Sequence, residues 1–237
     1  MRSSLSYLLL LGLSCLAAGC AHRPQTFLLS GASCGDAPAR LKELWKDLHE
    51  AVETPGGCDQ ESGRRCEYLQ NAISRLALNC PTTPDVLMAN ALLAFQAHNL
   101  IHAQELLDQL LSLQVSYPEA ASLRARIALQ EGNLRFALKF LEQELHRFGD
   151  DAGLHETYAS ALFLAQRWDP ARAQLGIAAK LGAPAWRVAF GLGLIDETQG
   201  RFPQARERYQ EALQARPGWR LPEARVRAMV AEGKVPR

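Results

Sequence analysis

Between Pro84 and Pro217 the sequence repeats one pattern every 34 residues, four times, without insertion or deletion. Each copy has a small residue, followed twelve positions later by an alanine with large apolar neighbours at fixed spacing. The alanines are Ala103, Ala137, Ala171 and Ala205, and the small residues are Ala91, Ala125, Ala159 and Gly193. A unit of this length is too small to bury its own apolar face and must stack on its neighbours. The repeat therefore predicts a solenoid.

Each unit is predicted to consist of two helices joined by a tight turn. Turn-forming residues interrupt the apolar pattern once inside each unit, at 97–99, 131–133, 166–167 and 199–201, and again between units. The small residues at the eighth and twentieth positions of a unit allow its two helices to approach closely, with large residues filling the space around the contact. We therefore expect an all-α fold.

Composition excludes some partners. The chain has 237 residues, of which 48% are hydrophobic, which is enough for a sizeable core. Its 26 Lys and Arg residues nearly balance its 25 Asp and Glu residues, and no basic stripe with interleaved aromatic residues appears. The electrostatic footprint of a nucleic-acid-binding protein is missing, so we expect no nucleic-acid partner.

The amino terminus predicts secretion and lipidation. Arg2 precedes an apolar run that ends in small residues before Cys20, which is typical of a secretory signal over residues 1–19. The junction resembles the lipobox of bacterial lipoproteins, in which the cysteine is acylated and becomes the new amino terminus, although Ala17 replaces the usual leucine. Since Ala21 rather than Asp follows Cys20, the resemblance implies an outer-membrane lipoprotein that faces the periplasm. Cys15 is the alternative lipidation site, and an ordinary cleaved signal is the alternative to lipidation.

Residues 20–35 are predicted to form a lipidated tether, and residues 36–83 an antiparallel helical hairpin broken at Pro55-Gly56-Gly57. Its second helix, from about Arg64 to Asn79, keeps the 34-residue phase, but its first helix does not. The hairpin is therefore a degenerate terminal repeat, as a stacked array requires at its end.

Four cysteines remain in or beside this hairpin, an even number that suggests two disulfides in an oxidising compartment. Two of them fall at the turn of the hairpin and two at its open end. A disulfide needs a Cα separation of ~5.5 Å, and a bridge along one helix would have to span most of it. We therefore expect Cys34 to pair with Cys80 and Cys58 with Cys66.

The repeat resembles a tetratricopeptide repeat (TPR) array. The last unit has all five residue types of the TPR pattern, and the earlier units have fewer of them; the five are Gly193, Ala205, Tyr209, Ala212 and Pro217. The resemblance covers 84–217 and implies a right-handed solenoid of helical hairpins, which the disulfide-linked hairpin precedes. Residues 218–237 are predicted to cap it with one more helix, from Pro222 to Glu232, and a tail.

In this family the first helices line a groove that binds protein partners. The corresponding positions here predict a mostly apolar groove suited to an apolar peptide or an amphipathic helix. Its residues include Met88, Leu92, Phe95, Ser122, Arg126, Leu129, Glu156, Ser160, Phe163, Arg187, Phe190 and Leu194. The Lys and Asn set with which some TPR proteins hold a terminal carboxylate is absent. The alternative is that neighbouring helices, or Phe27-Leu28-Leu29 of the tether, cover part of this stripe.

Candidate chemistry is weak. Ser33 lies in a G-x-S-x-G pattern, but the serine hydrolase elbow needs a parallel sheet, and no later stretch reads as strands. His98 and His102 are four residues apart, yet the repeat phase places His98 in a turn. The cysteines with His49 could hold zinc, but no C-x-x-C pair exists. We expect no enzyme activity, no cofactor and no metal.

The combined pattern is similar to TPR lipoproteins that assist type IV pilus secretins or serve gliding-motility complexes. This resemblance implies a scaffold for an envelope machine, with secretin or motility-complex subunits as partners. Regulation of a peptidoglycan synthase or hydrolase is the alternative function, with that cell-wall enzyme as the partner.

Overall fold

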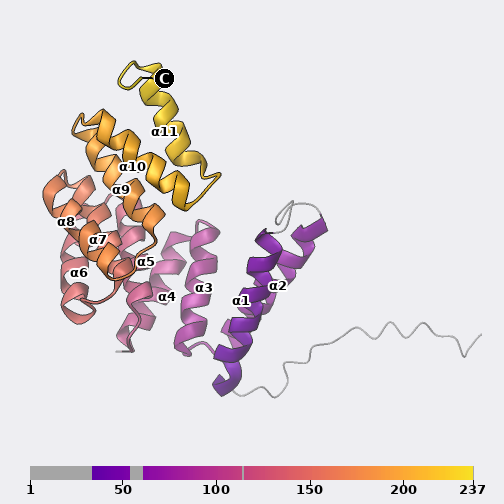
Figure 1. Ribbon diagram of the computed structural model, residues 1–237. Helices are drawn as coiled ribbons and strands as arrows, with labels where there is room; N and C mark the ends of the chain where they lie inside the picture. Colours follow the sequence, from indigo (N-terminus) through magenta and orange to yellow (C-terminus); the bar gives the residue numbers. More distant parts are fainter. Residues whose placement is uncertain (1–33, 54–60, 114, 237) are drawn as a thin grey trace, which may run out of the picture. The chain divides into compact units, whose positions relative to one another are not determined.

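The computed structural model describes residues 34–53, 61–113 and 115–236, and within these ranges it contains eleven α-helices and no strand. The expected all-α class is confirmed (Figure 1). A short 3-10 helix, Cys34–Asp36, precedes the α-helices. These are α1 (Ala37–Glu53), α2 (Glu61–Asn79), α3 (Pro84–Gln96), α4 (Leu100–Ser112), α5 (Pro118–Gln130), α6 (Leu134–Arg147), α7 (Ala152–Leu164), α8 (Trp168–Lys180), α9 (Ala185–Thr198), α10 (Phe202–Ala215) and α11 (Arg220–Ala231).

The four predicted repeats correspond to the pairs α3–α4, α5–α6, α7–α8 and α9–α10. The turn inside each pair contains one residue with a positive φ, and these residues are 34 positions apart: His98 (58°), Gly132 (76°), Gln166 (58°) and Gly200 (74°). In the first two repeats an asparagine follows and caps the next helix. Asn99 Oδ1 accepts a hydrogen bond from the His102 amide at 3.2 Å, and Asn133 Oδ1 accepts one from the Phe136 amide at 3.3 Å.

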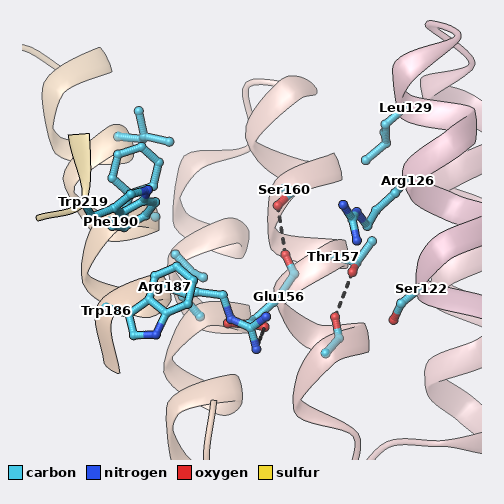
Figure 2. Close-up of a pocket in the computed structure, with 14 residues that line it drawn as sticks. Ser122, Arg126, Leu129, Glu156, Thr157, Ser160, Trp186, Arg187, Phe190 and Trp219 are labelled. Atoms are coloured by element: carbon cyan, nitrogen blue, oxygen red, sulfur yellow. Dashed lines mark hydrogen bonds and ion pairs between the residues drawn. The ribbon is translucent and has the colours of Figure 1, made fainter. Parts of the chain in front are cut away.

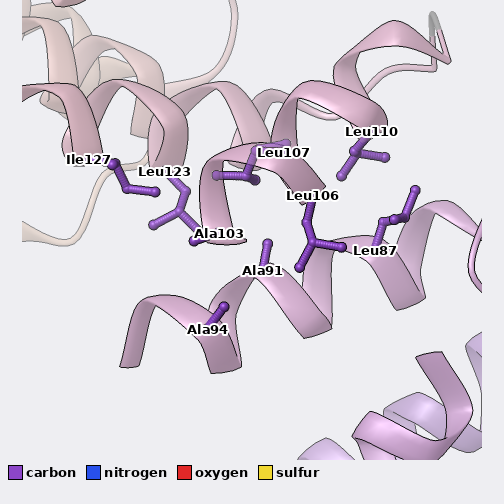
Figure 3. Close-up of a cluster of buried hydrophobic side chains, with 10 residues drawn as sticks. Leu87, Ala91, Ala94, Ala103, Leu106, Leu107, Leu110, Leu123 and Ile127 are labelled. Carbon is purple, nitrogen blue, oxygen red and sulfur yellow. The ribbon is translucent and has the colours of Figure 1, made fainter. Parts of the chain in front are cut away.

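Small residues bring the paired helices together. Ala91 of α3 and Ala103 of α4 are fully buried, and leucines surround their contact (Figure 3). Leu123 and Ile127 of α5 join the same cluster, so the second repeat closes the core of the first. Burial of each such leucine or isoleucine contributes about 1.5–3 kcal/mol, which a helix pair alone could not obtain.

The amino-terminal hairpin packs α1 against α2 and carries the predicted disulfide between Cys34 and Cys80, with a Cα separation of 5.5 Å. Ile73 and Leu76 of α2 share a core with Val86 and Ala89 of α3, so the hairpin stacks on the first repeat. The α2 helix begins at Glu61, earlier than the expected Arg64. The second predicted pair, Cys58 and Cys66, lies outside the described side chains.

The final helix, α11, packs against α10 and begins at Arg220, two residues before the predicted start. Its buried Met229, together with Val235 beyond the helix, covers Ala205 and Tyr209 of the last repeat. The apolar face that a further repeat would have covered is therefore closed by α11.

Candidate partner-binding groove

The first helices of three successive repeats approach one another, because α5 contacts α7 and α7 contacts α9. These three helices, with Leu175 of α8 and Trp219, line a groove of about 630 Å³, which we call the central groove (Figure 2). It contains predicted residues from repeats two to four, namely Ser122, Arg126, Leu129, Glu156, Ser160, Arg187, Phe190 and Leu194. The structure therefore brings these side chains together, and their contact with a partner remains a prediction.

The first repeat does not contribute to the central groove. Met88, Leu92 and Phe95 lie on α3, half-buried, and pack against the leucine and alanine core of the α3–α4 pair. Large apolar side chains at these positions gain more from packing on that core than from facing solvent. Phe95 also lies under the guanidinium group of Arg126, 5.5 Å from its ring centre.

The polar centre of the groove contains an ion pair between α9 and α7. Arg187 Nη2 lies 3.1 Å from Glu156 Oε2, and the Glu156 side chain is only 14% exposed. Burial raises the pKa of the Glu156 carboxyl, and the charge of Arg187 opposes this shift only in part. Figure 2 shows the two side chains meeting between their helices.

Two polar atoms of the groove are buried without a hydrogen-bond partner in the described part of the chain: Glu156 Oε1 and Ser122 Oγ. The neighbouring hydroxyls are satisfied, because Thr157 Oγ1 donates to the Gly153 carbonyl at 2.8 Å and Ser160 Oγ donates to the Glu156 carbonyl at 3.0 Å. An unpaired buried polar group costs about 1–3 kcal/mol, so the two atoms lower the stability of this part of the array.

Aromatic side chains form one end of the groove. Trp219 lies edge-on to Trp186, with ring centres 4.8 Å apart, and 4.6 Å from the ring of Phe190. Arg216 covers the Trp186 ring at 4.4 Å. Sequence reasoning missed both tryptophans, because they stand at the junction between α9, α10 and α11 rather than at the repeat positions that face the groove. The sequence signal that could have indicated this aromatic wall is that one tryptophan stands at the start of the last unit and the other just after its end.

A smaller apolar cavity of about 230 Å³, which we call the side pocket, opens beside the groove between α7 and α9. It shares Ser160, Leu175, Gly191 and Leu194 with the groove and is otherwise lined by Ala159, Phe163, Leu164 and Ile195. Phe163, predicted as a groove residue, therefore lines this pocket and not the groove; its ring lies edge-on to Trp168 at 5.3 Å.

The other sequence candidates form no site in the described residues. Cys20 and Ser33 lie outside those residues. His98 is in the turn before α4 and His102 is on α4, 3.5 Å from Glu105. Nowhere in the described ranges do three or more His, Cys, Asp or Glu side chains gather as a metal site would require. None of the described helices is long and apolar enough to cross a bilayer.

No family model matches the sequence, and no curated protein sequence matches it significantly. Solved structures of low sequence identity match the fold. TTC0263, a TPR protein of Thermus thermophilus, is 17% identical, with 84% of this chain and 100% of that chain covered and a TM-score of 0.65. A chain of the APC/C hetero-tetramer Cut9–Hcn1 is 12% identical, with 84% and 42% covered and a TM-score of 0.67. YrrB, a TPR protein described as having an unusual peptide-binding site, is 10% identical, with 82% and 100% covered and a TM-score of 0.50. The protein therefore has the fold of a TPR solenoid.

Proposed function

We propose that this protein is a protein–protein interaction scaffold that holds a peptide segment of its partner in the central groove. The observation that carries the proposal is the groove itself, which the first helices of three repeats line, with the exposed Arg126 of α5 in its lining and an aromatic wall at one end. A peptide segment can lie along such a groove, pack an apolar side chain on the aromatic wall and pair a polar or acidic group with Arg126. The described peptide-binding site of YrrB, a protein of the same fold, adds support.

The groove holds little that could perform chemistry. Its titratable side chains are two arginines and one glutamate, and one arginine already pairs with the glutamate. Such a set can bind and orient a peptide, but it offers no activated nucleophile beside a base. Binding is the function that this site supports best.

We further propose that the scaffold is an outer-membrane lipoprotein, anchored through acylated Cys20, that serves an envelope machine of the motility or secretin type. Support comes from the sequence: the apolar run, the small residues before Cys20 and Ala21 after it. Acyl chains bind membranes with about 0.8 kcal/mol for each buried CH₂, so several chains would hold the protein at the membrane. Metabolic labelling with an alkyne palmitate should label the wild type and not Cys20→Ala; equal labelling of both would overturn the anchor.

A photoreactive residue tests the groove. With p-benzoylphenylalanine at Ser160, which lines the groove and is exposed, irradiation of intact cells should crosslink one or a few envelope proteins. The matched control is Arg135 on α6, which is exposed and outside the groove. Adducts that are equal at both positions, or absent at Ser160, would overturn the scaffold function of this groove.

A further inference from the structure

We propose that the central groove selects an acidic peptide segment that inserts one large apolar side chain into the side pocket. The inference rests on the proposed function, since it concerns the same groove, and it names the chemistry of the partner. Two independent features carry it: the size and lining of the side pocket, and the uncompensated positive charge of the groove.

The side pocket has the size of an apolar anchor site. Its volume is about 230 Å³, and most of its lining consists of aliphatic and aromatic side chains. An apolar cavity of about 150 Å³ lined by such side chains stays dry and accepts benzene. A leucine, methionine or phenylalanine side chain of a partner therefore fits. Leu164, at 54% exposed, is the one lining residue that presents a large apolar surface to solvent.

The side pocket is continuous with the groove, because Ser160, Leu175, Gly191 and Leu194 line both, and Gly191 lets the Leu175 side chain pack against its backbone. A Cβ atom built at Gly191 would lie 2.9 Å from Leu175 Cδ1, so a side chain there would push into the pocket wall. In the other repeats the same position carries a side chain, namely Ala89, Leu123 and Thr157, and all three are buried. The close packing of a leucine side chain on a glycine at this position is thus specific to the fourth repeat.

The charge of the groove favours an acidic partner. Arg126 is exposed, and its contact within the described residues is with the ring of Phe95, not with a carboxylate. Arg216 lies over Trp186 at the aromatic end, again without a carboxylate partner in the described chain. Glu156 is the one carboxylate of the lining, and Arg187 already neutralises it. Complementary charge on a partner would guide it to this surface.

The peptide test begins with a random library displayed on phage and selected on the full-length protein. We expect enriched peptides to share one Leu, Met or Phe with Asp or Glu close by. Fluorescence anisotropy should show affinity falling at least about tenfold in Gly191→Leu, which displaces Leu175 from the wall shared by the pocket and the groove. Because Gly191→Leu perturbs Leu175, the surface variant Leu164→Ser gives a second measure, with a several-fold loss expected. Ile177→Ser, an equally polar change at an exposed position of α8 outside both cavities, should leave affinity unchanged.

The charge test uses Arg126→Gln, which should weaken binding and reduce its dependence on salt, and Arg135→Gln, which should do neither. Enriched peptides without a shared apolar residue, or affinities unchanged in both Gly191→Leu and Leu164→Ser, would overturn the inference. If either result occurs while envelope proteins still crosslink at Ser160, the scaffold function stands and the proposed anchor pocket is wrong.

Two other occupants give distinct outcomes, and each would overturn the inference. Self-association of the wild type that Gly191→Leu abolishes in sedimentation would make a second copy the occupant. Substitution of Phe27, Leu28 and Leu29 by serine that raises peptide affinity about tenfold would assign the pocket to the chain's own segment.

Discussion

The ring of Tyr209 fills the space that a side chain at Gly193 would need, because a Cβ atom built at Gly193 would lie 2.6 Å from Tyr209 Cε1. In the preceding repeats an alanine and a leucine occupy the same two positions, as Ala159 and Leu175 do in the third. The last repeat therefore combines a larger residue with a smaller one, so that the volume at the helix contact is conserved.

This relationship predicts a non-additive pair of substitutions. Gly193→Ala should destabilise the protein by about 1–3 kcal/mol, since the fully buried Tyr209 has little room to move. Adding Tyr209→Leu recreates the pair of the earlier repeats and should recover part of the loss, although the hydrogen bond from Tyr209 Oη to Glu197 Oε2 disappears. Urea unfolding of the wild type, Gly193→Ala, Tyr209→Leu and the double variant measures the coupling energy.

Gly176→Ala is the control for this cycle. Gly176 lies in α8 with open space around a Cβ atom, so alanine should stabilise the helix by about 0.5–1 kcal/mol. Equal effects of Gly193→Ala and Gly176→Ala would contradict a steric role for Tyr209.

The repeated turns predict two stabilising substitutions. His98 and Gln166 each have a φ of 58°, whereas the equivalent residues Gly132 and Gly200 are glycines. Side chains in this left-handed region cost about 1–2 kcal/mol, so His98→Gly and Gln166→Gly should each raise the free energy of unfolding, by up to about 1 kcal/mol. Thermal melting checks this. The neighbouring Ala97 has a φ of −77°, so Ala97→Gly should lower stability, and a gain there would contradict the explanation.

The buried carboxylate of Asp196 predicts acid sensitivity. Arg172 donates a hydrogen bond to Asp196 Oδ1 at 2.6 Å, and Arg201 donates two more, at 2.9 and 2.7 Å. Burial alone would raise the pKa of Asp196, but the hydrogen bonds and charges of the two arginines outweigh it and lower the pKa. Because the folded-state pKa lies below the unfolded-state value, the stabilisation is present above about pH 4 and is lost as pH falls further.

Asp196→Asn should therefore destabilise the protein at neutral pH and flatten the decline in stability below about pH 4. Urea titrations at stepped pH measure both effects. Asp150 is exposed in the turn before α7, so Asp150→Asn should retain the wild-type pH profile. An unchanged slope in Asp196→Asn would show that other carboxyl groups control acid unfolding.

The Cys34–Cys80 disulfide predicts that reduction weakens the amino-terminal hairpin. It closes a loop across 46 positions, and in the chain-entropy model such a crosslink stabilises by about 4 kcal/mol. Hydrogen exchange of α1 should accelerate in Cys34→Ser more than that of α9. The main contacts of α1 are with α2, α3 and the 3-10 helix that carries Cys34, so loss of the bridge acts first on α1. Uniform acceleration along the chain would mean that the bridge stabilises the whole array. A peptide map of non-reduced protein that lacks the Cys34–Cys80 pair would reject the bridge itself.

Several features of the fold could be predicted from residues close together in the chain. Ala91 and Ala103 stand at a fixed spacing that a helical hairpin requires, and Asn99 between them predicts the turn. The pairing of Cys34 with Cys80 followed from the hairpin geometry alone. In each case the decisive interaction is local or repeats with the period of the fold, so the sequence records it directly.

The extent of the groove could not be predicted in the same way. Met88 and Phe190 occupy the same position of their repeats, yet Met88 packs on the core of its own repeat while Phe190 joins the aromatic wall with Trp219. Which of the two occurs depends on the helices that follow, and Trp219 reaches the groove from beyond the last repeat.

The sequence by itself determined the repeat, the helix pairs, the terminal hairpin and one disulfide, because each depends on spacing along the chain. Only the tertiary structure decided that a side pocket forms between α7 and α9, that Glu156 and Ser122 keep unpaired atoms, and that the first repeat stays outside the groove. These properties depend on the space left between helices that are distant in sequence, and packing in three dimensions sets that space.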